Sequence, residues 1–183
     1  IDPGRKINLN AITKIYSGSS NKCKKLVYEF YNLFISKLIG VQDNKTAEFV
    51  KIFENIFRSV NISLVNEMKM ISDKFNVDIT EVINAASTKP YGFMKFLPGP
   101  GIGGHCIPVD PFYLTWKAKE YNIHTRFIEL AGEINNYMPL WIFEKINNHL
   151  VEKNLFIKKI KFLVLGASYK KNISDTRESP SIK

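Results

Sequence analysis

The chain has 183 residues, of which 45% are hydrophobic and 23% are charged. These values are typical of soluble globular proteins and exclude a collagen-like repeat, a generally disordered chain and a small disulfide scaffold. Lys and Arg outnumber Asp and Glu by 26 to 17, a formal charge of +9, which raises the expectation of an anionic partner such as a nucleotide, a nucleic acid or a membrane surface. A Lys-rich solvated surface is the alternative, because the basic residues are spread through the chain.

The first part of the chain alternates between short β-like and longer helical patterns. Residues 12–17 predict a short strand that ends at Gly18. Apolar residues at helical spacing predict a helix over residues 21–39. Asp43 is a suitable N-cap for a long helix over residues 46–75.

The middle of the chain is helical on both sides of one glycine-rich and proline-rich loop. Asp78, with a glutamate three residues later, predicts the start of a short helix that ends near Ala86. Residues 87–105 predict an ordered loop. Helices follow at about 111–121 and about 125–152, the second with Pro139 expected to kink or interrupt it.

The pattern changes near the end of the chain. Residues 159–166 form a β-rich apolar run ending in glycine, which predicts the first strand of an α/β unit, and residues 169–180 predict a polar loop. The fold class is therefore mainly α: an all-helical domain followed by the first strand of an α/β domain. The chain starts without Met and ends at Lys183 without a closing element, so we expect a piece of a longer polypeptide.

Residues 99–104 satisfy the G-x-G-x-x-G pattern of dinucleotide-binding folds. That mechanism needs a strand before the glycines and a βαβ unit around them, and neither is predicted here. Glycines can nevertheless bring backbone N–H groups close to a ligand without interference from Cβ atoms. We therefore interpret the run as a ligand-binding loop and not as a Rossmann fingerprint.

The glycines lead directly into His105, Cys106 and Asp110. A thiol before the start of a helix lies where a thiolate is favoured, and Asp110 follows one helical turn later. For an arbitrary cysteine, burial as a small apolar residue would remain the commoner role. No metal site is predicted, because adjacent residues point apart and no second ligand cluster exists.

Lys51 and Asn55 are four residues apart on the predicted long helix and therefore share a face. A cation and an amide directed at one spot could hold an oxyanion or a water molecule. From spacing alone, an exposed polar face is the alternative and the commoner one.

Three segments resemble signatures of the nucleotide-sugar 6-dehydrogenases, the UDP-glucose and GDP-mannose dehydrogenase family. Residues 47–55 resemble its A-E-x-x-K-x-x-x-N helix, residues 101–110 its G-x-G-G-x-C-x-x-D loop, and residues 169–180 its F-K-x-x-x-x-D-x-R-E-S-P segment. They occur in the family's order. Residues 98–114 and 127–135 look most like the branch that acts on UDP-N-acetyl-hexosamines (GlcNAc or ManNAc).

The resemblance implies a three-domain enzyme of which this chain is the middle part. Residues 1–18 would be the end of the N-terminal NAD domain or a linker. Residues 19–157 would be a helical central domain, like that of 6-phosphogluconate dehydrogenase, which carries catalysis and the homodimer contact. Residues 158–183 would begin the C-terminal UDP-sugar domain. The N-terminal NAD domain would be absent, and the fragment alone would be inactive.

The resemblance also assigns roles to residues. The C6 hydroxyl of the UDP-sugar would be oxidised to a uronic acid with two NAD+, through a thiohemiacetal and a thioester on Cys106. Lys51 and Asn55 would stabilise the anionic intermediates, Asp110 would orient water, and Arg177 would approach NAD. The implied substrate contacts are Phe96, Leu97, Gly99, Gly101, Gly103, Tyr169 and Lys170.

Some features leave alternatives open. Val109 stands where UDP-glucose enzymes often have Lys, which argues against glucose as the substrate sugar. The competing hypothesis is a basic helical module that dimerises or binds nucleic acid without catalysis. Under the enzyme hypothesis we expect a UDP-sugar substrate, no nucleic-acid or membrane partner, and a cytoplasmic location, since only two cysteines and no targeting segment are present.

Overall fold

A computed structural model describes residues 9–168, 172 and 174–182. The chain divides into two compact units, the first containing residues up to Glu54 and the second beginning at Asn55. Over the described residues the fold is mainly α, with five α-helices, two three-residue strands and two short 3-10 turns. This confirms that the fold class is mainly α, as predicted.

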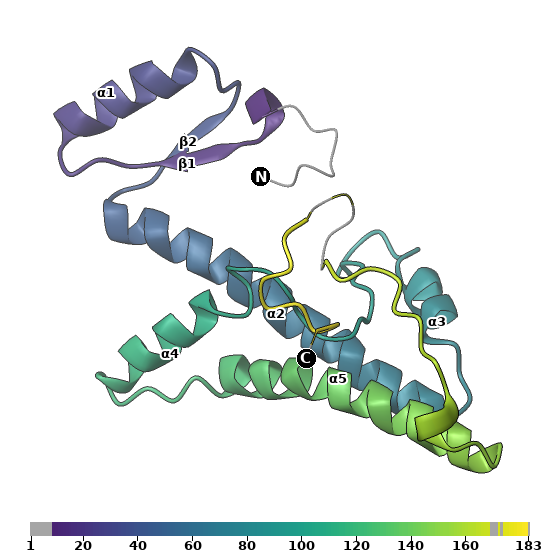
Figure 1. Cartoon of the computed structure of the whole chain (residues 1–183). Helices are drawn as coiled ribbons and strands as arrows, with labels where there is room; N and C mark the ends of the chain where they lie inside the picture. Colours follow the sequence, from purple (N-terminus) through teal and green to yellow (C-terminus); the bar gives the residue numbers. More distant parts are fainter. Residues whose placement is uncertain (1–8, 169–171, 173, 183) are drawn as a thin grey trace. The chain divides into compact units, whose positions relative to one another are not determined.

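The first unit is a small β–α–β arrangement in which α1 packs against both strands (Figure 1). The two strands are parallel, and their register pairs Ile15 with Ile39. The Ser20 hydroxyl caps α1 by accepting a hydrogen bond from the Cys23 N–H at 3.2 Å. The elements are η1 (Leu9–Ala11), β1 (Lys14–Tyr16), α1 (Asn21–Asn32) and β2 (Leu38–Gly40).

The strand predicted over residues 12–17 is present as β1, but the helix predicted over residues 21–39 ends at Asn32. Leu33, Phe34 and Leu38 continue the helical spacing, which made the segment resemble one longer helix. Leu38 instead lies in β2, beside Lys14 of β1, because the pairing of two strands distant in sequence overrides local periodicity.

The predicted caps of α2 (Asn44–Lys74) and α3 (Ile79–Ala86) are both formed. The Asp43 carboxylate accepts from the Thr46 N–H at 2.7 Å, and this hydrogen bond holds the pKa of Asp43 below its usual value. The Asp78 carboxylate accepts from the Thr80 N–H at 2.8 Å. These carboxylates supply hydrogen-bond acceptors to backbone N–H groups of the first helical turn, which have no acceptor within the helix.

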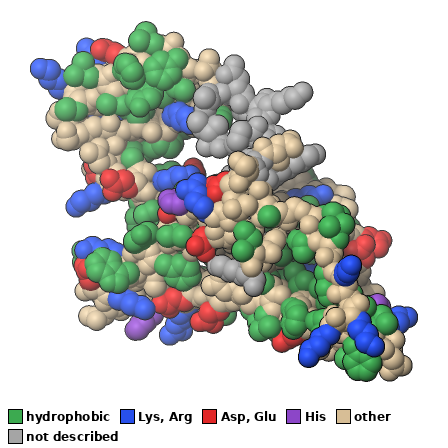
Figure 2. All heavy atoms as spheres, viewed as in Figure 1, with side chains coloured by type: hydrophobic (Ala, Val, Ile, Leu, Met, Phe, Trp, Pro, Cys, Tyr) green, Lys and Arg blue, Asp and Glu red, His purple; other side chains and the backbone are tan. Residues whose placement is uncertain are grey.

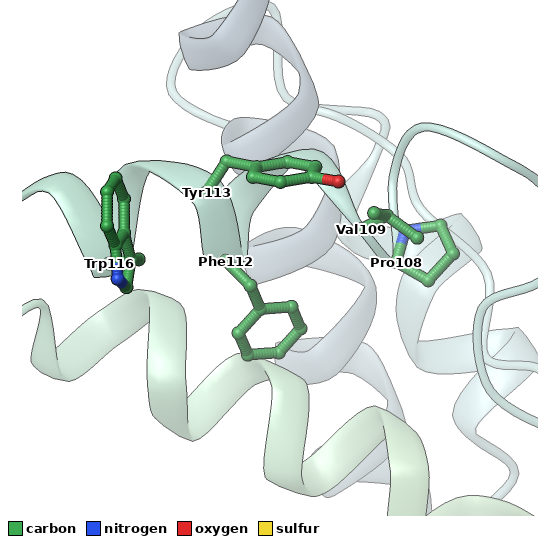
Figure 3. A pocket seen from close by; sticks show the side chains of 5 residues that line it. All are labelled: Pro108, Val109, Phe112, Tyr113 and Trp116. Atoms are coloured by element: carbon green, nitrogen blue, oxygen red, sulfur yellow. The ribbon is translucent and has the colours of Figure 1, made fainter.

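The segment after the loop forms α4 (Asp110–Lys119) and α5 (Arg126–Glu152), as predicted. Pro139 lies inside α5 without interrupting it. Phe112 points from α4 toward α5 (Figure 3), where Gly132 leaves room for its ring. A Cβ atom at Gly132 would lie 2.5 Å from the Cζ of Phe112, so the two helices approach closely at this point.

The buried face of α2 is polar. The exposed fractions of Asn55 and Asn66 are 1% and 0%, whereas Leu64, from the apolar stripe of the same helix, is 53% exposed. Hydrophobic side chains form several patches on the visible face (Figure 2). We call the buried set the polar face of α2: Asn55, Ser59, Ser63, Asn66 and Ser72.

The strand predicted over residues 159–166 is not formed. A 3-10 turn, η2 (Ile157–Lys159), is followed by residues 160–167 without regular secondary structure. Leu163 and Leu165 are strongly exposed, since no described strand lies alongside to complete a ladder. Within the described part of the chain, no helix is both long and apolar enough to cross a bilayer.

Candidate active site

Asn55 and Asp110, both predicted site residues, are in direct contact. The Asn55 Nδ2 donates a hydrogen bond to the Asp110 Oδ2 at 2.8 Å. Asn55 lies on α2 and Asp110 is the first residue of α4, so the bond joins two helices that are 55 residues apart in sequence. Because Asn55 is buried, this amide has little alternative access to water.

Arg58 completes this cluster and was not predicted. Its Nη2 donates to the Asn55 Oδ1 at 2.5 Å, so the Asn55 amide lies between a guanidinium and a carboxylate. The signal was present in the sequence, since Arg58 follows Asn55 by three residues and therefore shares its helix face. Arg58 thus places a cationic group against the Asn55 amide in the second unit.

Cys106 lies in the turn that leads into α4. Its carbonyl accepts hydrogen bonds from the Val109 N–H at 3.3 Å and the Asp110 N–H at 2.8 Å. Its thiol is exposed and lies 3.9 Å from the Nδ1 of His105. The turn therefore links the backbone of Cys106, whose thiol is accessible, to the backbone of Asp110.

Lys51 lies on α2, one helical turn before Asn55, within the first compact unit. Its ammonium group is exposed and approaches the Glu54 carboxylate at 3.9 Å. An exposed ion pair of this length holds a lysine only weakly, so the side chain is available to other anions.

Two buried amides anchor the glycine-rich loop. The Gly99 N–H donates to the Asn66 Oδ1 at 2.9 Å, and the Asn66 Nδ2 donates to the Asn135 Oδ1 at 2.9 Å. The Asn135 Nδ2 in turn donates to the Ser59 carbonyl at 3.2 Å. The network joins the loop to α2 and α5, and neither asparagine was predicted as a site residue.

Gly101 lies where only glycine fits. Its φ angle is +118°, and a Cβ atom there would be 2.7 Å from the Asn135 carbonyl oxygen. Gly103 is partly buried in the same loop. Phe96 packs edge-on against Phe57 of α2 with ring centroids 6.0 Å apart.

Leu97 is 55% exposed, so it is free to contact a ligand. The segment around Arg177 meets the loop close to the thiol, because the Arg177 carbonyl accepts a hydrogen bond from the Gly104 N–H at 3.1 Å. The Arg177 guanidinium is held by Asp175, at 2.9 Å from Nε and 2.6 Å from Nη2. Tyr169 and Lys170 lie outside the described residues.

The described residues do not fit a complete dinucleotide site. Residues 99–104 follow no strand, and α4 begins only at Asp110. The N–H groups of Gly99 and Gly104, which could have faced a phosphate, already donate within the protein. The interpretation of this G-x-G-x-x-G run as something other than a Rossmann fingerprint therefore agrees with the structure.

An apolar pocket lies beside the turn that carries the thiol. It is lined by Pro108, Val109, Phe112, Tyr113 and Trp116 (Figure 3). Tyr113 and Trp116 are 68% and 66% exposed, so the pocket is an open surface of α4.

Comparisons with known proteins identify the family of the chain. The model of the UDP-glucose/GDP-mannose dehydrogenase family, central domain, matches residues 45–137. The UDP-N-acetyl-D-mannosamine dehydrogenase of Methanococcus vannielii is 40% identical over 171 residues, which are 93% of this chain and 38% of that protein. The UDP-N-acetyl-D-glucosamine 6-dehydrogenase of Salmonella typhi is 35% identical over 181 residues, 98% of this chain and 42% of that protein.

A solved structure agrees with the fold. The UDP-D-ManNAc dehydrogenase of Pyrococcus horikoshii matches with a TM-score of 0.86 and 34% identity, over 94% of this chain and 40% of that one. The chain thus spans about two fifths of the length of these relatives, and none of the three lends support to a nucleic-acid-binding module. Because the family model covers residues 45–137, more than half of the sequence, the chain belongs to the UDP-glucose/GDP-mannose dehydrogenase family.

Proposed function

We propose that this chain is the catalytic and dimerising core of a dehydrogenase that oxidises C6 of a UDP-N-acetyl-hexosamine to the uronic acid. The observation that carries the proposal is the Asn55–Asp110 contact beside the exposed thiol of Cys106. A nucleophile and a carboxylate one turn apart, with an amide donor hydrogen-bonded to that carboxylate, suit covalent acyl chemistry. The relatives that act on N-acetylated sugars favour the hexosamine branch.

In the proposed reaction, the C6 hydroxyl first loses a proton and a hydride and becomes an aldehyde. The thiolate of Cys106 then adds to the aldehyde carbon, and loss of a second hydride from that carbon leaves a thioester. Water adds to the thioester carbonyl, the C–S bond breaks, and the acid is released as the thiolate is regenerated. NAD+, implied by the family resemblance, would accept the hydride in both oxidations when bound.

The chain's own groups have separate tasks in this scheme. Lys51 and the remaining N–H of Asn55 stabilise negative charge on the reacting oxygen, and Asp110 takes the proton of the attacking water. Residues 96–104 hold the sugar and its phosphate together with Tyr169 and Lys170, and Arg177 contacts NAD. Most of the NAD site then belongs to parts of the enzyme beyond this chain, and the isolated chain does not turn over.

We propose that a second copy of the chain covers the apolar residues exposed on α2 and α5. Leu64, Met68 and Ile71 follow one another at helical spacing on α2, and Leu140 and Phe143 are more than half exposed on α5. Exposed apolar stripes of this kind mark protein interfaces. Sedimentation of the enzyme should show a dimer that Leu64→Lys converts to monomer; a wild-type monomer contradicts the proposal.

We also propose a cytoplasmic location, because both cysteines of the chain are free and thiols stay reduced in that compartment. The test of the proposed function is UDP-sugar-dependent NADH formation by the full-length enzyme. Two NADH should form for each uronate, with UDP-N-acetylmannosamine and UDP-N-acetylglucosamine compared as substrates.

Cys106→Ser should lower turnover by about 10³-fold or more, because the alcohol cannot form the thioester. Cys23→Ser is the matched control. Cys23 is also exposed, and the Ser20 and Ser19 hydroxyls lower the pKa of its thiol, so accessibility alone does not distinguish the two sulfurs. Full activity of the Cys106→Ser enzyme would contradict the proposed function.

A further inference from the structure

The side-chain amide of Asn55 is held from both ends. Arg58 donates to its oxygen at 2.5 Å, and its nitrogen donates to Asp110 at 2.8 Å. The exposed fraction of Asn55 is 1%, so water competes little for either end. Arg58 therefore contacts Asp110 only through the amide in this network of three side chains.

The chemistry of the two neighbours allows one orientation of the amide. A guanidinium offers only N–H donors, and an ionised carboxylate offers only acceptors. If the Asn55 amide turned over, its NH2 would face the donors of Arg58 and its oxygen would face the carboxylate oxygens of Asp110. Both contacts would then be repulsive in a site with little water.

The Asn55 amide keeps its orientation toward Asp110 only while the Asn55 side-chain oxygen accepts a hydrogen bond from a donor such as Arg58. Without Arg58, the buried Asn55 oxygen would lose its partner, and the amide could rotate to find another one. The hydrogen bond to Asp110 would weaken, and the carboxylate at the start of α4 would gain rotational freedom. Arg58 thus controls the orientation of Asp110 without touching it in the described structure.

We propose that Arg58 is a positioning residue for thioester hydrolysis. This inference rests on the proposed function and deepens it by assigning Arg58 to one step. In that step water attacks the acyl carbon on Cys106, Asp110 takes the proton from the water, the C–S bond breaks, and the sulfur leaves as a thiolate. The amide of Asn55, fixed by Arg58, keeps the Asp110 carboxylate aimed at the water.

The inference predicts which step fails when Arg58 is removed. In the full-length enzyme, Arg58→Gln should slow hydrolysis by about 10²-fold, the cost of misplacing a reacting group by about 1 Å. The first turnover of NADH formation should fall less than hydrolysis does, because Lys51 also stabilises the reacting oxygen in that step, and the KM for the UDP-sugar should change by less than about 3-fold. The acyl group should therefore accumulate on Cys106, visible as added mass on the intact protein after rapid quenching.

Matched variants separate positioning from a structural effect. Arg58→Lys keeps one cationic donor for the Asn55 oxygen and should recover hydrolysis to within about 10-fold of wild type. Asn55→Asp keeps an acceptor for Arg58 but loses the donor to Asp110, so its hydrolysis should slow more than its first NADH turnover although Arg58 is present. Arg126→Gln, a change of an exposed arginine on α5, should behave as wild type.

Each outcome is informative. If Arg58→Gln slows the first NADH turnover and hydrolysis equally, or raises only KM, the positioning role is wrong and Arg58 acts in folding or substrate binding. If Arg58→Gln fails to fold, Asn55→Asp decides: a hydrolysis rate in that variant that falls no more than its first turnover overturns the inference. If wild type forms no acyl species on Cys106 under any quench, the proposed function fails first, independently of Arg58.

Discussion

Asn66 of α2 and Asn135 of α5 share a hydrogen bond of 2.9 Å between two side chains that are almost completely buried. The same Asn66 amide accepts from the Gly99 N–H, so a helix–helix contact also sets the position of the glycine-rich loop. Buried amides hold such a position firmly, because leaving them unpaired costs free energy. The loop geometry is therefore built into the core of the second unit.

Replacing Asn66 by Ala should release the loop. The Gly99 N–H and the Asn135 oxygen would lose their partner, at a cost of about 1–3 kcal/mol in the free energy of unfolding. Amide hydrogen exchange at Gly99 should become faster, and the KM for the UDP-sugar should rise. Asn61→Ala is the control, since the Asn61 amide bonds only to the Phe57 carbonyl of its own helix. If the rate of amide hydrogen exchange at Gly99 stayed unchanged, the hydrogen bonds of Asn66 would not anchor the loop.

Gly101→Ala should displace the loop by steric conflict. The new Cβ would lie 2.7 Å from the Asn135 carbonyl, and φ of +118° adds backbone strain of about 1 kcal/mol. Gly92→Ala separates the two causes, because Gly92 also has a positive φ, of +74°, but no atom within 4 Å of the added Cβ. Thermal unfolding should show a clearly larger loss of stability for Gly101→Ala. Equal losses of thermal stability in Gly101→Ala and Gly92→Ala would indicate that backbone strain, and not the contact with Asn135, causes the loss.

Gly132 and Phe112 should be strongly coupled. Alanine in a helix interior normally gains about 1 kcal/mol over glycine, but here the Cβ would meet the Phe112 ring at 2.5 Å. We expect Gly132→Ala to destabilise the wild type and to stabilise a Phe112→Leu background. A double-mutant cycle measured by urea unfolding gives the coupling energy, expected between about 0.5 and 3 kcal/mol. If the stability changes of Gly132→Ala and Phe112→Leu were additive, α4 would be able to move away from α5 at little cost.

Asp73 should make stability depend on pH. Burial raises the pKa of its carboxyl, but hydrogen bonds from Lys145 and Lys69 outweigh burial, and the net pKa lies below the usual value. A lowered folded-state pKa stabilises the protein above the unfolded pKa of about 4, and this stabilisation is lost as pH falls through the folded pKa.

We therefore expect Asp73→Asn to cost about 1 kcal/mol at pH 7, a modest value because Lys145 is half exposed, and to cost nothing near pH 2. Trp141 is a convenient reporter, since the Lys145 ammonium lies 5.2 Å from its ring centroid. Urea unfolding followed by its fluorescence, in a Trp116→Phe background, measures the difference at each pH. Glu67→Gln, an exposed change on α2, is the control. If the loss of stability in Asp73→Asn did not depend on pH, the ionised Asp73 carboxylate would not be the source of the stabilisation.

Local signals in the sequence predicted much of the helical fold. Asp43 and Asp78 marked the starts of α2 and α3 because a cap acts on its own first turn. Non-local pairing was beyond such signals. Nothing near Leu38 indicates that it lies beside Lys14, and the apolar run at residues 159–166 could not show that it would lack a described partner strand.

The candidate site was predicted in part for the same reason. Asn55 and Asp110 were expected together through the family resemblance, and the structure places them in contact. Arg58 was missed because an arginine on an amphipathic helix is normally solvated. Asn66 and Asn135 were missed because hydrophobic patterning assumes that the buried face is apolar, whereas the buried face of α2 is polar.

The polar face of α2 also affects how the protein responds to temperature. Exposing apolar surface raises the heat capacity, whereas exposing polar surface lowers it. Separating α2 from α5 along Ser59, Asn66 and Asn135 therefore changes the heat capacity little. The contact between α2 and α5, which also positions the glycine-rich loop, should therefore lose less stability on cooling than an apolar contact of equal area.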